Sequence, residues 1–168
     1  MKRALILASF AVLALGGCGD SGKQENPSEA TESASPDSKP GLSVSDGVLV
    51  LPAVKGRPGA AYFAVTNGAG EPTSLAAVSV DGAGKAEMHE TKGGKMEPIN
   101  WVQLEPGKTV RFERGGKHVM LFDLADTLRP GGTAEMTLTF SGGDKLSTPL
   151  RIEAAGGDMA GTDHGDMH

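Results

Sequence analysis

The sequence predicts an all-β protein built as one antiparallel sandwich or barrel, and three observations lead to this class. Nine short segments rich in strand-forming residues follow one another, with Gly, Pro, Asn or Asp between them. No stretch keeps the 3.6-residue apolar period of an amphipathic helix. Glycine contributes 25 of the 168 residues, roughly twice its usual share of about 7%, which favours tight turns over long helices.

The first 17 residues are predicted to be a lipoprotein signal peptide. A basic start is followed by an apolar run over 4–15 and by two glycines. That run is shorter than the ~20 residues that a membrane-spanning helix needs. Cys18, the single cysteine, stands where bacterial lipoproteins are cleaved and lipidated. We therefore expect a lipid-anchored protein of the bacterial periplasm, on the inner or the outer membrane. The alternative is an ordinary signal peptide with an incidental cysteine.

Three regions are predicted after the signal peptide. Residues 18–42 hold mostly Ser, Pro, Glu and Gly, so they cannot bury enough apolar surface to offset chain entropy and are expected to be a disordered tether. Residues 43–154 are expected to form the folded domain, and 155–168 a flexible tail that contains His and Met.

The strands of the predicted domain are short and end at turn residues. Residues 133–140 alternate most cleanly, with Met136, Leu138 and Phe140 on one face, so these three are predicted core residues. Pro149 interrupts the last segment, which favours an edge strand there. The nine predicted strands are 48–51, 60–66, 75–80, 86–91, 99–104, 109–112, 118–124, 133–140 and 146–152.

Composition and motifs exclude several classes of function. A net charge of −5 argues against a nucleic-acid partner, because few cations are left over to neutralise phosphates. One cysteine excludes an internal disulfide framework and Cys-rich zinc or iron–sulfur sites. Neither a G-x-S-x-G nucleophile elbow nor an H-E-x-x-H metalloprotease motif is present. The chain is therefore not expected to be an enzyme.

Methionine and histidine recur together at strand spacings. His118 and Met120 are two residues apart and so point to one face of a strand. A hairpin around two glycines at 93–94 can bring His89 and Met96 to neighbouring positions. Imidazole and thioether together form a soft, largely neutral site that favours Cu(I). The alternative is that these methionines fill the core, as methionine often does.

The same residues carry a resemblance to a known family, the periplasmic copper(I) chaperones called PCuAC. That family has a His, a Met after a loop, 21 further residues and then His-x-Met; here 21 residues separate Met96 from His118. The blocks around these residues are similar as well, so the resemblance runs from about residue 48 to residue 152. They are GAAYFAVTN at 59–67, EMHET at 87–91, GGKHVML at 115–121, LRPG at 128–131 and LTF at 138–140.

The resemblance implies a cupredoxin-like β-sandwich of Greek-key type with a Cu(I) site. The family usually has ten residues between the first His and the Met, whereas this chain has six. The shorter hairpin can keep both ligands on one rim if its turn tightens, and Met88 is a reserve ligand if it does not. The Cu(I) ligands implied by the resemblance are His89, Met96, His118 and Met120.

The tail carries a second set of copper-binding side chains. His164, Met167 and His168 are candidates for a copper-loading arm that could also take Cu(II), and the alternative is a disordered, solvated end. His/Met tails occur in the family.

The resemblance implies that the function is delivery of copper, toward the binuclear copper centre of cytochrome c oxidase. The acceptor would then be subunit II of that oxidase or another copper chaperone. Two alternatives stay open: a periplasmic copper buffer for tolerance without a specific acceptor, and a β-sandwich interaction module that binds no metal.

Overall fold

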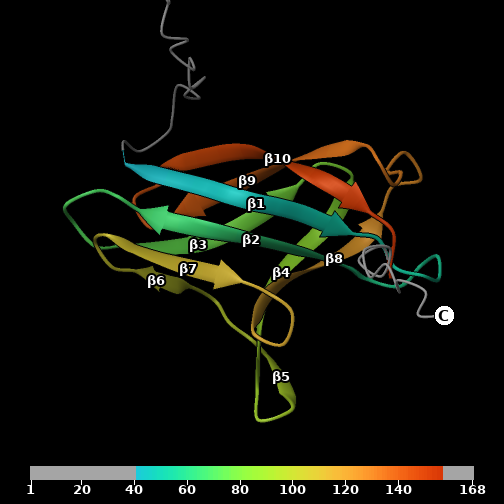
Figure 1. Ribbon diagram of the computed structural model, residues 1–168, viewed down its shortest axis with the longest axis horizontal. Coiled ribbons are helices and arrows are strands. Elements are labelled where there is room, and N and C mark those ends of the chain that lie inside the picture. Colours follow the sequence, from blue (N-terminus) through green and yellow to red (C-terminus); the bar gives the residue numbers. More distant parts are fainter. Residues whose placement is uncertain (1–40, 157–168) are drawn as a thin grey trace, which may run out of the picture. The chain divides into compact units, whose positions relative to one another are not determined.

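The computed structural model describes residues 41–156, which form ten β-strands and no helix (Figure 1). Within this range there is thus no helix long and apolar enough to cross a membrane. The strands are β1 (Leu42–Val50), β2 (Gly59–Asn67), β3 (Thr73–Val80), β4 (Ala83–Lys92), β5 (Lys95–Pro98), β6 (Val102–Leu104), β7 (Lys108–Phe112), β8 (Lys117–Leu124), β9 (Thr133–Phe140) and β10 (Lys145–Glu153).

The strands form one hydrogen-bonded ladder in the order β5-β4-β8-β7-β2-β1-β10-β9-β3-β6, with a second pairing between β8 and β2. The ladder folds over, so that β1, β2 and β7 make one layer of a sandwich and β9, β3 and β6 make the other (Figure 1). Pairing is antiparallel except between β1 and β10 and at one bridge between β7 and β8. The predicted all-β sandwich is confirmed.

The core lies between these two layers and contains the side chains that the alternation of residues 133–140 predicts. Met136, Leu138 and Phe140 are each no more than 1% exposed. The rings of Phe63 on β2 and Phe112 on β7 stack with their centres 4.4 Å apart. This continuous apolar interior fixes which face of each strand is left for other roles.

Three details of the predicted strands are wrong. The first strand, predicted over 48–51, begins earlier, because β1 starts at Leu42, the last residue of the predicted tether. The segment 99–104 shrinks to β6, and the preceding residues form β5, which pairs only with β4. Pro149 does not lie in an edge strand, because β10 runs between β1 and β9. The missing N–H is tolerated because the pairing of β10 with β1 begins only at Arg151, beyond the proline.

Candidate metal centre

The pairing of β4 with β8 brings the two domain histidines together. His89 and His118 are direct cross-strand partners, and their ring centres lie 6.0 Å apart. Two residues away on each strand, Glu87 lies opposite Met120. Cross-strand partners and residues two positions apart share a face of the sheet. All four side chains therefore lie on one face, which we call the site face.

The sequence of β4 explains why this face is free. Along the strand, Ala86 and Met88 alternate with Lys85, Glu87 and His89. The apolar set turns inward, where Met88 pairs with Val119 and is only 6% exposed. The polar set is left on the opposite side. Met88, the reserve ligand of the sequence analysis, belongs to the hydrophobic core and lies across the sheet from His89.

The β4–β5 hairpin brings Met96 to the same face. Its two-residue turn consists of Gly93 and Gly94, which have φ values of 58° and 79° and so adopt a conformation that glycine accepts readily. Across this turn Met96 pairs with Thr91, two residues from His89. The family's usual spacing of ten residues is four longer than the spacing here. If a hairpin loses two residues from each of its two strands next to the turn, the remaining residues keep the same cross-strand partners. A six-residue spacing is therefore compatible with the register of a longer hairpin.

His89 lies at the centre of the group. His118 is directly opposite, whereas Met96 and Met120 are diagonal neighbours on the two flanking strands, with Cα atoms roughly 7–8 Å away. Long side chains reach across such diagonals. The structure thus brings together the four side chains that the resemblance implies as ligands.

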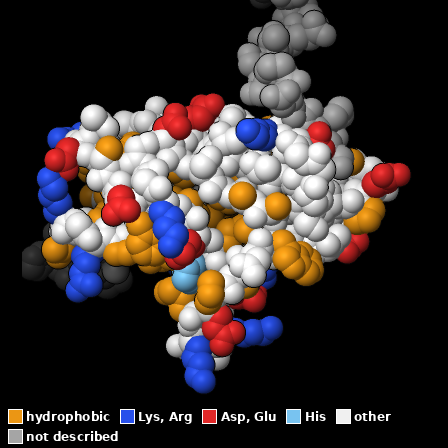
Figure 2. Space-filling view, turned by 180° about the vertical axis from the view of Figure 1, so that it is seen from behind, with side chains coloured by type: hydrophobic (Ala, Val, Ile, Leu, Met, Phe, Trp, Pro, Cys, Tyr) orange, Lys and Arg blue, Asp and Glu red, His pale blue; other side chains and the backbone are white. Residues whose placement is uncertain are grey.

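Exposure increases from the histidines outward. His118 is 6% exposed and the side chain of His89 15%, whereas Met96 is 53% exposed. In Figure 2 a histidine surface appears beside apolar side chains at the base of the projecting hairpin. An ion bound here would be held by sheltered imidazoles and reached from solvent on the Met96 side.

Hydrogen bonds hold both imidazole rings. His118 Nδ1 lies 3.0 Å from the carbonyl oxygen of Gly116, and His89 Nε2 lies 3.4 Å from Glu87 Oε2. Among the buried side-chain nitrogens and oxygens of residues 41–156, His89 Nδ1 alone has no partner. Buried polar atoms are normally satisfied, so such an atom needs a ligand or a special role to explain it.

The dimensions suit a single metal ion. A first-row ion about 2.0 Å from an imidazole nitrogen lies about 3.2 Å from the centre of that ring. Ring centres 6.0 Å apart can therefore share one ion. The donor set of two imidazoles and two thioethers is the soft kind that Cu(I) prefers.

Glu87 is a site residue that the sequence reasoning missed. The signal was its position two residues before His89, which places both side chains on one face of a strand. Its other oxygen, Oε1, accepts a 2.6 Å contact from the ammonium of Lys85. The Lys85 contact and the neighbouring His89 hold the pKa of Glu87 below its usual value. Within residues 41–156, no group of three or more His, Cys, Asp and Glu could hold a metal ion.

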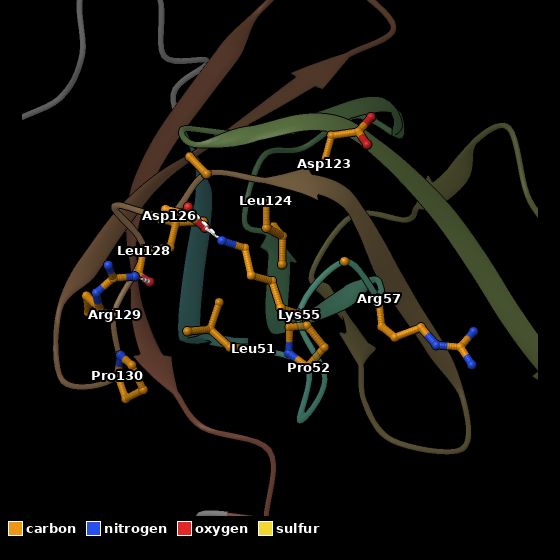
Figure 3. Close-up of a pocket in the computed structure, with 12 residues that line it drawn as sticks. Leu51, Pro52, Lys55, Arg57, Asp123, Leu124, Asp126, Leu128, Arg129 and Pro130 are labelled. Atoms are coloured by element: carbon orange, nitrogen blue, oxygen red, sulfur yellow. Dashed lines mark hydrogen bonds and ion pairs between the residues drawn. The ribbon is translucent and has the colours of Figure 1, made fainter.

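A cavity of about 370 Å³ lies away from the predicted ligands, near the C-terminal end of β8. Leu124, which lines it, is six residues along β8 from His118, or roughly 20 Å in an extended strand. Figure 3 shows Lys55 reaching Asp126 beside the apolar side chains of this cavity. None of the predicted ligands lines it.

Comparison with known families gives a match over residues 42–152, which is most of the chain, to the family described as "Putative lipoprotein LpqE-like". The chain belongs to the LpqE-like family. A comparison with curated proteins found no match for this LpqE-like chain.

Solved structures similar to the LpqE-like chain include PCuAC domains. The apo PCuAC domain from PmoF1 is 28% identical, with a TM-score of 0.58 over 68% of this chain and 94% of that domain. The copper-bound PCuAC domain from PmoF2 is 24% identical, with a TM-score of 0.59 over 68% and 93%. A solution structure of Cu(I)-bound DR1885 from Deinococcus radiodurans is 25% identical, with a TM-score of 0.54 over 74% and 83%. The predicted cupredoxin-like fold is confirmed.

Four predicted functional residues of the LpqE-like chain lie outside the described residues. They are Cys18 in the N-terminal segment and His164, Met167 and His168 in the tail. Their roles stay predictions.

Proposed function

We propose that this LpqE-like protein is an extracytoplasmic metallochaperone that binds Cu(I) and passes it to an acceptor protein. The observation that carries the proposal is the convergence of two imidazoles and two thioethers on one face, around His89. The Cu(I)-bound state of DR1885, a structural relative of 25% identity, supports the choice of metal. His89, Met96, His118 and Met120 are the proposed ligands.

The proposed activity is ligand exchange rather than catalysis. The sheltered histidine pair retains the ion while a sulfur or nitrogen donor of the acceptor approaches from the exposed Met96 side. Copper then passes through an intermediate in which both proteins contribute ligands, without a change of oxidation state. Imidazole must be neutral to bind a metal, so acidification is expected to weaken Cu(I) binding.

The proposed destination is the binuclear copper centre of cytochrome c oxidase, reached through subunit II or through another copper chaperone. Mixing the Cu(I)-loaded protein with an apo acceptor domain and following the metal tests delivery. Transfer faster than release to a chelator of equal affinity supports a chaperone. Release at the same rate to both would instead indicate a copper buffer.

The anchor and the tail belong to the same proposal. Lipidation of Cys18 would hold the domain at a bacterial membrane in the periplasm. His164, Met167 and His168 would bind copper as a loading arm that supplies Cu(I) to the domain, and the same side chains could hold Cu(II) on the tail itself. Truncation after Ala155 should lower Cu(II) stoichiometry without changing the Cu(I) site, and unchanged Cu(II) stoichiometry would refute the loading arm.

X-ray absorption on the Cu(I)-loaded protein tests the ligand set directly. The wild-type protein should show mixed sulfur and nitrogen ligation. Met96→Ala should lower the sulfur count, and His89→Ala should lower the nitrogen count and cause the larger loss of affinity, because His89 neighbours the other three ligands. Absence of Cu(I) binding in a chelator competition would favour an interaction module that binds no metal.

A further inference from the structure

We infer that Glu87 is a positioning residue that makes His89 bind Cu(I) through Nδ1, whereas His118 binds it through Nε2. The inference rests on the proposed Cu(I) site and adds which nitrogen of each ring carries the metal. It follows from the hydrogen bonds that the two rings make in the structure.

The tautomer of His118 is fixed by a backbone carbonyl. Its Nδ1 lies 3.0 Å from the oxygen of Gly116, and a carbonyl oxygen can only accept a hydrogen bond. Nδ1 must therefore carry the hydrogen. A neutral imidazole has one remaining lone pair, and in His118 it lies on Nε2.

His89 has the opposite arrangement. Its Nε2 faces Oε2 of Glu87 at 3.4 Å, and an ionised carboxylate also only accepts. Nε2 then carries the hydrogen, and the lone pair lies on Nδ1. That nitrogen is buried and without a partner. An acceptor left bare in this way is costly in a folded protein, and a metal ion would satisfy it.

Glu87 is itself held in place. Lys85 Nζ contacts Oε1 at 2.6 Å, which leaves Oε2 for His89. The three side chains follow one another at every second position of β4 and so share the site face. The separation of 3.4 Å between Nε2 and Oε2 is longer than the ~2.7–3.2 Å of an ordinary N–H···O bond, so this contact is weak. The contact therefore selects a ring orientation and a tautomer more than it stabilises the fold.

The two outer partners give the histidines different donor strengths. A carboxylate behind an imidazole raises its basicity and fixes its orientation, and loss of such a partner typically costs 10–100-fold in metal affinity. A carbonyl behind His118 orients that ring but carries no charge. His89 is therefore the stronger of the two nitrogen donors.

The first experiment needs no copper. Two-bond ¹H–¹⁵N spectra of the histidine rings, recorded on the full chain at pH 8, report which nitrogen carries the hydrogen. We expect the Nε2–H tautomer for His89 and the Nδ1–H tautomer for His118. Glu87→Ala should shift His89 toward a mixture and leave His118 unchanged, and Glu87→Gln, which keeps an acceptor oxygen, should partly restore the wild-type signal. A wild-type His89 in the Nδ1–H form, or unmoved by Glu87→Ala, would overturn the inference.

The second experiment measures Cu(I) affinity by competition with a chromogenic chelator. Glu87→Ala should weaken binding about 10–100-fold. Glu97→Ala is the matched control, because it removes one carboxylate from β5 on the face away from Met96 and should leave affinity unchanged. If His89→Ala abolishes binding but Glu87→Ala does not alter it, Glu87 is not a positioning residue and the site stands. If neither His89→Ala nor Met120→Ala alters binding, the proposed site itself fails, and with it the inference.

Discussion

The sequence alone does not show which of Met88 and Met120 is a core residue and which is a ligand. Truncating each of them to alanine tests whether Met88 faces the core and Met120 lies on the site face. Met88 is 6% exposed and belongs to the core, whereas Met120 is half-buried on the site face between Glu87 and Ala60. The two positions thus differ in what an alanine removes: apolar packing at one and a proposed ligand at the other.

The expected size of each effect follows from burial. Truncating a buried Met to Ala costs about 2–5 kcal/mol through lost transfer free energy and the cavity left behind. In a domain of this size a loss of 2 kcal/mol lowers Tm by about 8 °C or more. Met120→Ala should lower stability by about 1 kcal/mol, the average for a point substitution. Its Cu(I) affinity should fall at least about tenfold, which corresponds to about 1.4 kcal/mol.

The two measurements are thermal unfolding of the copper-free variants and chelator competition for Cu(I). Met88→Ala should be destabilised with unchanged affinity, and Met120→Ala should be weaker in affinity with nearly wild-type stability. The reasoning is refuted if folded Met88→Ala loses Cu(I) affinity as strongly as Met120→Ala does. That result would mean that β4 presents Met88, not His89, to the metal.

Three further predictions concern a hairpin turn, an ion pair and a buried amide. Gly94→Ala should cost about 1–2 kcal/mol, because φ of 79° at that turn disfavours any side chain, and it should also weaken Cu(I) binding through Met96; unchanged Tm and affinity would contradict this. Lys117 contacts Glu90 at 2.6 Å and lowers the pKa of that carboxyl. The stabilisation by this pair is therefore complete at neutral pH and is lost as pH falls below about 5. Glu90→Gln should flatten the acid side of a stability–pH profile, and an unaltered profile would show that the pair contributes nothing. Asn67→Ala removes three hydrogen bonds from a fully buried amide and should cost about 3 kcal/mol or more in urea unfolding; a loss below 1 kcal/mol would contradict it.

The alternation of apolar and polar residues predicted those strands in which one face is entirely apolar. Residues 133–140 alternate strictly, and β9 has those bounds, because burying one face of a strand needs no information beyond a period of two. The alternation could not predict a strand's place in the sheet, because that place depends on which strands pair with it. Pro149 looked like an edge residue, but β10 is interior, and only the late start of its pairing with β1 makes the proline tolerable.

The candidate site shows the same division. Spacing within one strand was enough to place His118 beside Met120, and the glycine pair was enough to predict a tight hairpin that carries Met96. The role of Glu87 was not apparent from the sequence. A carboxylate two residues from a histidine affects the site only if its oxygen contacts the imidazole ring, as Glu87 contacts His89.

The sequence by itself determined the all-β class, the inward face of each clean strand and the inventory of soft donors, since each depends on residue type and period. The tertiary structure decided which of those donors meet. His89 and His118 are 29 residues apart in the chain and become partners only through the register of β4 and β8. That register is set by the core side chains Met88, Val119 and Leu121, because a slip of one residue would turn the apolar face outward and the histidines inward.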